Sequence, residues 1–171
     1  MGFGNKFAIR YHQFKIKMLT QENLNKIQVL KKQFPDTKSL TIPVLHIAQE
    51  QYGWISEETM KEIAKLLNLP VNHVIGVATF YTMFNKKPVG KYHIQVCTNI
   101  SCQLLGAEKI SEYICKKLNI KVGDTTPDKM FTISEVECLG SCGTAPMMQV
   151  NDDYHENLTT EKIDKLLQEL R

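Results

Sequence analysis

The chain has 171 residues, enough for one ordinary domain or two small ones. Hydrophobic residues make up 43% and charged residues 23%, which are the shares of a folded protein rather than of a disordered tail or a membrane protein. The longest nearly apolar run, residues 74–84, falls well short of the roughly 20 residues that cross a bilayer. We therefore expect a soluble protein without direct membrane insertion.

The net charge of +3 arises in the N-terminal segment. Four of the 21 basic residues lie in residues 1–17, which contain no Asp or Glu, so 17 basic residues face 18 acidic ones in the rest of the chain. A nucleic-acid-binding protein would carry a basic stripe on its folded surface, so we expect no nucleic-acid partner. We expect residues 1–19 to form a basic, mobile extension, because they are short and poor in Ser for a mitochondrial presequence.

Residues 20–87 are predicted to form a helical domain, because their apolar residues recur at helical spacing. The first helix starts at Gln21 and stops before Pro35. A second runs from near Ser39 to Gly53, since glycine is a common residue at the end of a helix.

The second half of this helical domain is predicted to contain two more helices. Ser56 is the expected N-cap of the third, and the fourth starts at Pro70. The fourth helix leads into the aromatic residues Phe80, Tyr81 and Phe84. We expect this aromatic cluster to lie first of all in the core of the domain, with contact to a partner as its second role.

Residues 88–171 change to a pattern of alternating strands and helices. The predicted elements are a strand over 92–97, a helix over 104–119, a strand over 131–138, a hairpin over 147–158 and a last helix capped by Thr159 or Thr160. Two strands joined through a helix should be parallel with a right-handed crossover. The predicted fold class is therefore α+β, with a helical bundle followed by a thioredoxin-like α/β domain.

Four of the five cysteines form two pairs, each at the end of a predicted strand. Cys97 and Cys102 enclose four residues, and Cys138 and Cys142 enclose three. Loops at the carboxyl ends of neighbouring parallel strands meet at one edge of a sheet, so the two pairs can form a single metal site. Cys115 lies in the predicted helix, and we expect it to be a packed small hydrophobic residue.

The spacing of the cysteines favours a [2Fe-2S] cluster over the alternatives. A loop of four residues between ligands suits an object larger than one zinc ion, although the second pair would fit zinc. The small residues of the 139–141 loop let backbone N–H groups approach the sulfur atoms of a cluster. A zinc site and two disulfides stay open as alternatives.

Several segments resemble the NuoE-type subunit of respiratory NADH dehydrogenase (complex I), whose relatives serve in NAD-linked hydrogenases and formate dehydrogenases. The segments that carry the resemblance are residues 76–84, 96–102, 137–142, 145–147 and 151–154. They stand in the family's order and spacing, and the resemblance covers about residues 20–171. Many relatives have Ala where this chain has Ser141.

The resemblance implies a thioredoxin-like ferredoxin domain over 88–171. The resemblance further implies that this domain carries one [2Fe-2S] cluster, with Cys97, Cys102, Cys138 and Cys142 as its ligands. The resemblance also implies that the helical domain docks on a flavin-containing, NADH-binding subunit, and that FMN and NAD bind only to that partner. Further iron–sulfur subunits are expected in the same complex. The expected role is one-electron transfer, without catalysis by this chain alone. The expected location is the bacterial cytoplasm, in the peripheral arm of a membrane-bound complex, rather than the mitochondrial matrix.

Three other functions are compatible with parts of the sequence. The equivalent subunit of an NAD-linked hydrogenase or formate dehydrogenase shares the same motifs, and a zinc-stabilised interaction module would use the same cysteines without redox activity. A thiol–disulfide oxidoreductase is disfavoured, because its usual C-x-x-C motif is absent. The sequence also contains no dinucleotide-binding fingerprint and no phosphate-binding P-loop.

Overall fold

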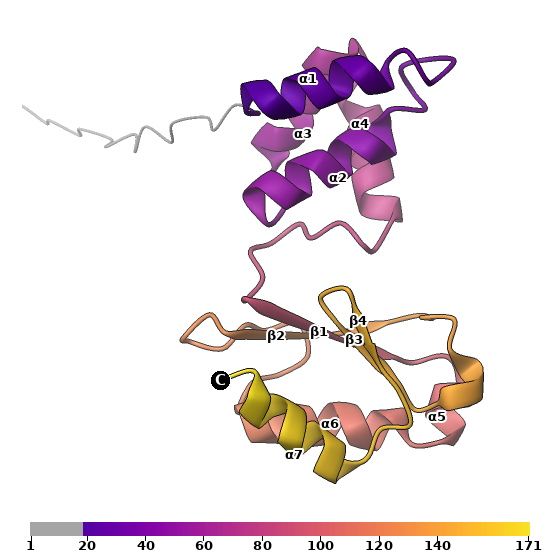
Figure 1. Ribbon diagram of the computed structural model, residues 1–171, viewed down its shortest axis with the longest axis vertical. Coiled ribbons are helices and arrows are strands. Elements are labelled where there is room, and N and C mark those ends of the chain that lie inside the picture. The colour runs from indigo at the N-terminus through magenta and orange to yellow at the C-terminus, as the bar shows by residue number, and fades with distance from the viewer. Residues whose placement is uncertain (1–18) are drawn as a thin grey trace, which may run out of the picture.

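The computed structural model describes residues 19–171. Figure 1 shows two lobes, an upper one built from helices α1–α4 and a lower one built from a sheet and helices α5–α7. The predicted N-terminal extension lies outside the described residues except for Leu19. Leu19 is buried against the upper helices, and its backbone N–H donates a 3.0 Å hydrogen bond to the carboxylate of Glu62, so this residue belongs to the helical lobe.

The helical lobe contains four helices that pack around one apolar core. Their bounds are α1 Gln21–Leu30, α2 Thr41–Tyr52, α3 Glu57–Leu67 and α4 Val71–Phe80. Two predicted helix ends are confirmed. Gly53 ends α2 in the left-handed conformation, at φ 80°, and the Ser56 hydroxyl accepts a 3.1 Å hydrogen bond from the Thr59 N–H at the start of α3.

Helix α1 ends at Leu30, earlier than the sequence pattern predicts. The N–H groups of Lys32 and Gln33 bond to carbonyl groups three residues back, on Val29 and Leu30, at 3.1 and 2.9 Å. Such bonds tighten the chain into a turn, so the α-helix does not continue toward Pro35.

The prediction that the aromatic cluster lies in the core is confirmed for Phe84 and wrong for Phe80 and Tyr81. Phe84 is buried, but 77% of Phe80 and 38% of Tyr81 are exposed. The buried side of α4 carries Val74 and Ala78. At about 100° per residue, Phe80 lies about 200° around the helix from Ala78 and therefore points away from the core.

The lower lobe contains a four-stranded mixed sheet in the order β2-β1-β3-β4. The strands are β1 Tyr92–Cys97, β2 Phe131–Val136, β3 Met148–Val150 and β4 Asp153–His155. Strands β1 and β2 are parallel, as predicted, while β3 is antiparallel to both β1 and β4. The predicted hairpin is formed by β3 and β4, with Asn151 in the turn at φ 54°.

The lower lobe also contains three helices, namely α5 Ile100–Leu104, α6 Ala107–Leu118 and α7 Thr160–Glu169. The single helix predicted over 104–119 is wrong at its start. Gly106 takes the left-handed conformation at φ 93° and separates α6 from α5, a short helix that the sequence pattern does not reveal. Helices α6 and α7 lie side by side on one side of the sheet (Figure 1) and are joined by hydrogen bonds of 2.9 Å from the Tyr113 hydroxyl to the Asp164 carboxylate.

The segment between the two lobes is anchored at both ends. In the upper lobe, the Asn85 N–H donates to the side-chain oxygen of Gln49 at 2.6 Å, and the Asn85 carbonyl accepts from the Ile55 N–H at 2.7 Å. In the lower lobe, the Gly90 N–H donates to the Thr132 hydroxyl at 2.6 Å. Only a few residues between these anchors are left to connect the lobes.

Candidate metal centre

The parallel register of β1 and β2 brings the two cysteine pairs to one edge of the sheet. Cys97 is the last residue of β1 and pairs with Val136, the last residue of β2. Cys138 follows β2 by two residues. Cys102 lies in α5, and Cys142 begins the 3-10 turn Cys142–Thr144. The structure therefore confirms that both loops leave the sheet at the same edge.

Pairwise interactions link the thiols of these four cysteines. The Cys97 thiol interacts with the thiols of Cys102 and Cys138, and the Cys102 thiol also interacts with that of Cys142. All four are free thiols, so the structure does not show the alternative of two disulfides. Cys97 and Cys102 belong to the buried core of the lobe, whereas Cys138 and Cys142 are exposed. One side of the site is therefore buried in the lobe, and the other side faces solvent.

Backbone N–H groups surround the sulfur atoms. Burial raises the pKa of the Cys97 thiol, but hydrogen bonds from the N–H groups of Asn99 and Leu139 and from the neighbouring thiols outweigh this effect and lower the pKa. In addition, the Gly140 N–H donates to the Cys138 sulfur at 3.4 Å. Gly140 has a φ of 79°, a conformation that glycine adopts without strain.

The thiol of Cys102 differs from that of Cys97. Burial raises its pKa, and the nearby Cys97 and Cys142 thiols raise it further, because two negative thiolates repel each other. One N–H donor, that of Met147, acts in the opposite direction. Four thiolates can therefore share this site only when a cation compensates their charge, as the irons of a cluster do.

The donor set fits an all-cysteine [2Fe-2S] cluster. Such a cluster is held by cysteine sulfurs, and hydrogen bonds to these sulfurs tune its potential. The two cysteine loops supply four thiols, with N–H donors from Asn99, Leu139 and Gly140. Among residues 19–171, no group of three or more His, Cys, Asp or Glu side chains is placed closely enough to hold a metal ion as these side chains lie.

Cys115 lies apart from this centre, as predicted. It is partly buried in α6 and packs against the core of the lower lobe. Burial raises the pKa of its thiol, so it is neutral and poorly suited to bind a metal.

Two residues beside the centre, Tyr154 and Glu156, were not predicted from the sequence. The Tyr154 hydroxyl donates to the backbone carbonyl of Leu139 at 2.8 Å. The Glu156 carboxylate accepts hydrogen bonds from the hydroxyls of Ser141 and Thr144. The one sequence signal for them is the period-2 spacing of Tyr154 and Glu156, which places both on one side of an extended segment.

The fold and the thiol-lined edge together define a small iron–sulfur protein built on a thioredoxin-like sheet. Residues 27–171 match the family model of the thioredoxin-like [2Fe-2S] ferredoxins, and the chain belongs to this family. Membership implies one [2Fe-2S] cluster.

The curated relatives agree in name and length. The chain is 47% identical over 152 residues to the E subunit of the NADH-quinone oxidoreductase of Rickettsia felis, covering 87% of this chain and 91% of the relative. It is 43% identical over 145 residues to the E subunit numbered 2 of the NADH-quinone oxidoreductase of Rhizobium meliloti, covering 85% and 86%.

A solved structure of an NAD⁺-reducing [NiFe]-hydrogenase also has a similar fold. The TM-score is 0.66 at 21% identity, over 77% of this chain and 22% of the hydrogenase chain. At this identity the likeness concerns the fold alone.

Proposed function

We propose that this chain is the one-electron-transfer iron–sulfur subunit of an NADH:quinone oxidoreductase. The observation that carries the proposal is that two loops with four free cysteines leave the same edge of the sheet. The chain is also closely similar over most of its length to the E subunits of such complexes. In this proposal Cys97, Cys102, Cys138 and Cys142 are the ligands of the [2Fe-2S] cluster.

The protein's contribution at this site is electrostatic. A [2Fe-2S] cluster bound by four thiolates carries a charge of −2 when oxidised and −3 when reduced, and it accepts electrons singly. The N–H groups of Asn99, Leu139 and Gly140 point at sulfur atoms of the site and stabilise this negative charge. The exposed side of the site, formed by Cys138 and Cys142, leaves room for an electron donor to approach.

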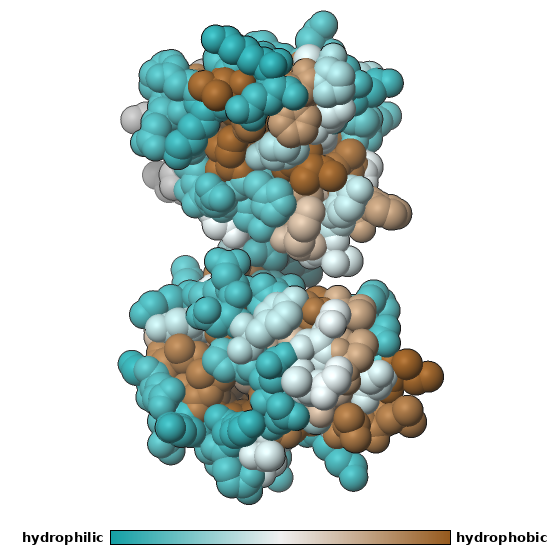
Figure 2. All heavy atoms as spheres, turned by 45° about the vertical axis from the view of Figure 1, so that its right-hand side comes forward, coloured by the Kyte–Doolittle hydropathy of each residue, from teal (hydrophilic) through white to brown (hydrophobic). Residues whose placement is uncertain are grey.

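The proposed donor is a flavin-containing, NADH-binding subunit that holds FMN and NAD. Two groups of exposed apolar residues support docking to such a partner. One group lies beside the metal centre, in α5 and at its C-terminal end, and consists of Ile100, Leu104 and Leu105. The other lies at the end of α4 and just after it, and consists of Phe80, Tyr81 and Met83. Figure 2 shows hydrophobic atoms gathered at the right edge of the lower lobe, on the side where Figure 1 places α5. Exposed apolar patches of this kind commonly mark protein interfaces.

Within this proposal the chain belongs to the peripheral arm of a bacterial complex, on the cytoplasmic side, together with further iron–sulfur subunits. No helix within residues 19–171 has the length and apolar character needed to cross a bilayer. The hydrogenase role stays the alternative, but the curated relatives named above are quinone-linked, and the likeness to the hydrogenase concerns only the fold.

Anaerobic absorbance and EPR spectroscopy of the purified chain test the proposal. Dithionite should reduce the protein to a one-electron paramagnetic state, at a potential of the order of −400 mV that is usual for all-cysteine ferredoxins. NADH alone should leave the oxidised spectrum unchanged, while NADH with the flavoprotein partner should bleach it. Rapid reduction by NADH in a flavin-free preparation of the chain alone would contradict the proposal.

A further inference from the structure

The loop that carries Cys138 and Cys142 is fastened to the segment that precedes α7. Backbone hydrogen bonds begin the attachment: the Asn157 N–H donates to the Thr144 carbonyl at 2.7 Å, and the Leu158 N–H donates to the Pro146 carbonyl at 2.9 Å. These bonds hold the chain after Cys142. They do not reach the residues between the two cysteines.

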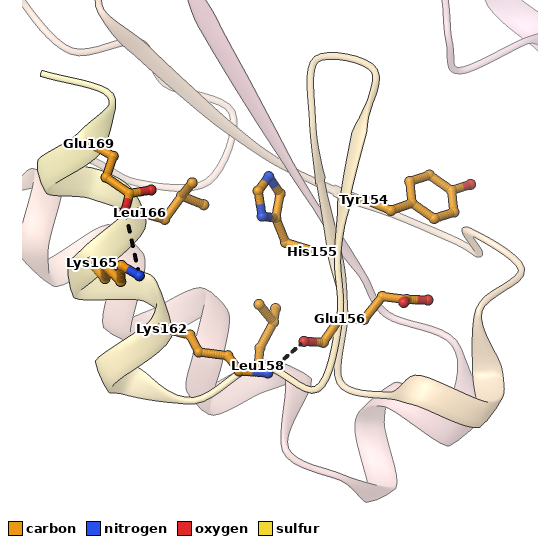
Figure 3. A pocket seen from close by; sticks show the side chains of 8 residues that line it. All are labelled: Tyr154, His155, Glu156, Leu158, Lys162, Lys165, Leu166 and Glu169. Carbon is orange, nitrogen blue, oxygen red and sulfur yellow. Dashed lines mark hydrogen bonds and ion pairs between the residues drawn. The ribbon is translucent and has the colours of Figure 1, made fainter.

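Side chains extend the attachment into the loop itself. The Tyr154 hydroxyl reaches the Leu139 carbonyl, and the Glu156 Oε1 atom accepts both from the Ser141 hydroxyl and, at 2.6 Å, from the Thr144 hydroxyl. Figure 3 shows Tyr154 and Glu156 projecting on the side away from α7, while His155 projects toward that helix. The segment thus uses one side to pack against α7 and the other to hold the cysteine loop.

Glu156 also brings a negative charge to this loop. Hydrogen bonds from Ser141 and then Thr144 lower the pKa of its carboxyl, so the group is ionised at neutral pH. In the described part of the chain, no Lys, Arg or His forms an ion pair with this carboxylate. The ammonium of Lys162 donates instead to the backbone carbonyls of Glu156 and Asn157, at 3.2 and 2.9 Å.

We propose that Glu156 is a positioning residue of the cluster site, which acts through two separable effects. Its hydrogen bonds hold the Cys138–Cys142 loop in place, and its charge opposes the electron that raises the negative charge of the cluster from −2 to −3. The inference rests on the proposed ligand set. In the complex the electron would come from the reduced flavin of the partner, and in the test it comes from dithionite.

The structure allows the two effects to be separated. Because both hydroxyls donate to the same oxygen, Oε1, the amide oxygen of a glutamine can accept both bonds. Glu156→Gln should therefore keep the loop and remove only the charge. We expect unchanged iron content and a three- to tenfold shift of the reduction equilibrium toward the reduced state, where tenfold corresponds to about 59 mV for one electron.

Glu156→Ala removes both the charge and the hydrogen bonds. It should show a similar shift in potential and, in addition, a several-fold faster loss of iron to a chelator than the wild type. The matched control is Glu169→Gln, which removes a carboxylate on α7 that pairs with Lys165 at 3.8 Å. This control should leave both the potential and the rate of iron loss unchanged.

Redox titration followed by EPR and chelator-driven iron release, on the full chain, decide between the outcomes. Equal midpoint potentials for wild type and Glu156→Gln would overturn the electrostatic effect, and equal rates of iron loss for wild type and Glu156→Ala would overturn the positioning effect. A wild-type chain that assembles no cluster would overturn the proposed function and this inference with it. A normal wild-type cluster with unaltered variants overturns only the inference.

Discussion

Cys97 and Val136 are partners at the last position of the parallel β1–β2 ladder. The next residue, Thr98, continues this contact, because its N–H and its hydroxyl both donate to the Val136 carbonyl, at 2.9 and 3.1 Å. The two cysteine loops therefore leave the sheet side by side. Strand register, rather than the loops themselves, sets where the first cysteine of each pair lies.

A first prediction concerns Gly90, where the chain enters the lower lobe. A Cβ at this position would lie 2.9 Å from backbone atoms of Met130 and Phe131. Backbone atoms cannot move aside as easily as the end of a flexible side chain, so the contact would have to be relieved by shifting the chain itself. Gly90→Ala should therefore lower the free energy of unfolding by about 1–3 kcal/mol, the usual cost of overpacking. Thermal unfolding measures the effect.

Gly76→Ala is the matched control. Gly76 lies within α4, and a Cβ there meets nothing within 4 Å. Because alanine is the better helix former, this variant should be more stable than the wild type by roughly 0.5–1 kcal/mol. A melting temperature of Gly90→Ala at or above that of the wild type would show that the close approach is not a constraint.

A second prediction concerns docking to the flavoprotein. Phe80 and Leu104 are 77% and 81% exposed, so replacing them should not disturb the fold. If they are central contacts, Phe80→Ser and Leu104→Ser should each weaken binding about tenfold, which corresponds to about 1.4 kcal/mol. Calorimetric titration with the partner measures this. Val29→Ser, on the exposed side of α1, serves as control, and wild-type affinity in both test variants would rule out these two patches.

A third prediction uses the contact between α6 and α7. The Lys117 ammonium, 2.9 Å from Asp164, and the Tyr113 hydroxyl lower the pKa of the Asp164 carboxyl. A carboxyl with a lowered pKa stabilises the fold above its unfolded pKa, near 3.9, and this contribution is lost as pH falls through the folded value. Asp164→Asn should therefore melt about 2 °C below the wild type at neutral pH, with a difference that closes below about pH 4. A difference that is constant down to pH 2 would contradict this origin.

The sequence predicts much of this structure where local signals are strong. Gly53 and Ser56 mark helix ends by their own backbone and side-chain chemistry, and the change from helical to alternating apolar spacing after residue 88 marks the start of the sheet. The convergence of the cysteine pairs follows from strand order alone. Each of these features depends on residues close together in the chain or on a general rule of parallel sheets.

Other features could not be predicted, because they depend on residues distant in sequence. A large aromatic residue such as Phe80 is expected in a core. It is exposed because of the way α4 packs against α2 and α3, which the sequence does not show. Glu156 contacts Ser141, which lies 15 residues away in the sequence, and no local sequence pattern predicts such a contact. The short helix α5 is recognisable only once Gly106 is known to take a left-handed conformation.

The central claim, that Cys97, Cys102, Cys138 and Cys142 hold the cluster, is tested most directly by iron and sulfide analysis with EPR on five single Cys→Ser variants. The wild type and Cys115→Ser should contain two irons and two acid-labile sulfides per chain and give the same EPR signal after reduction. Each of the other four variants should have reduced occupancy or an altered signal. A Cys115→Ser protein without iron, or a normal cluster in any of the four ligand variants, would contradict the assignment.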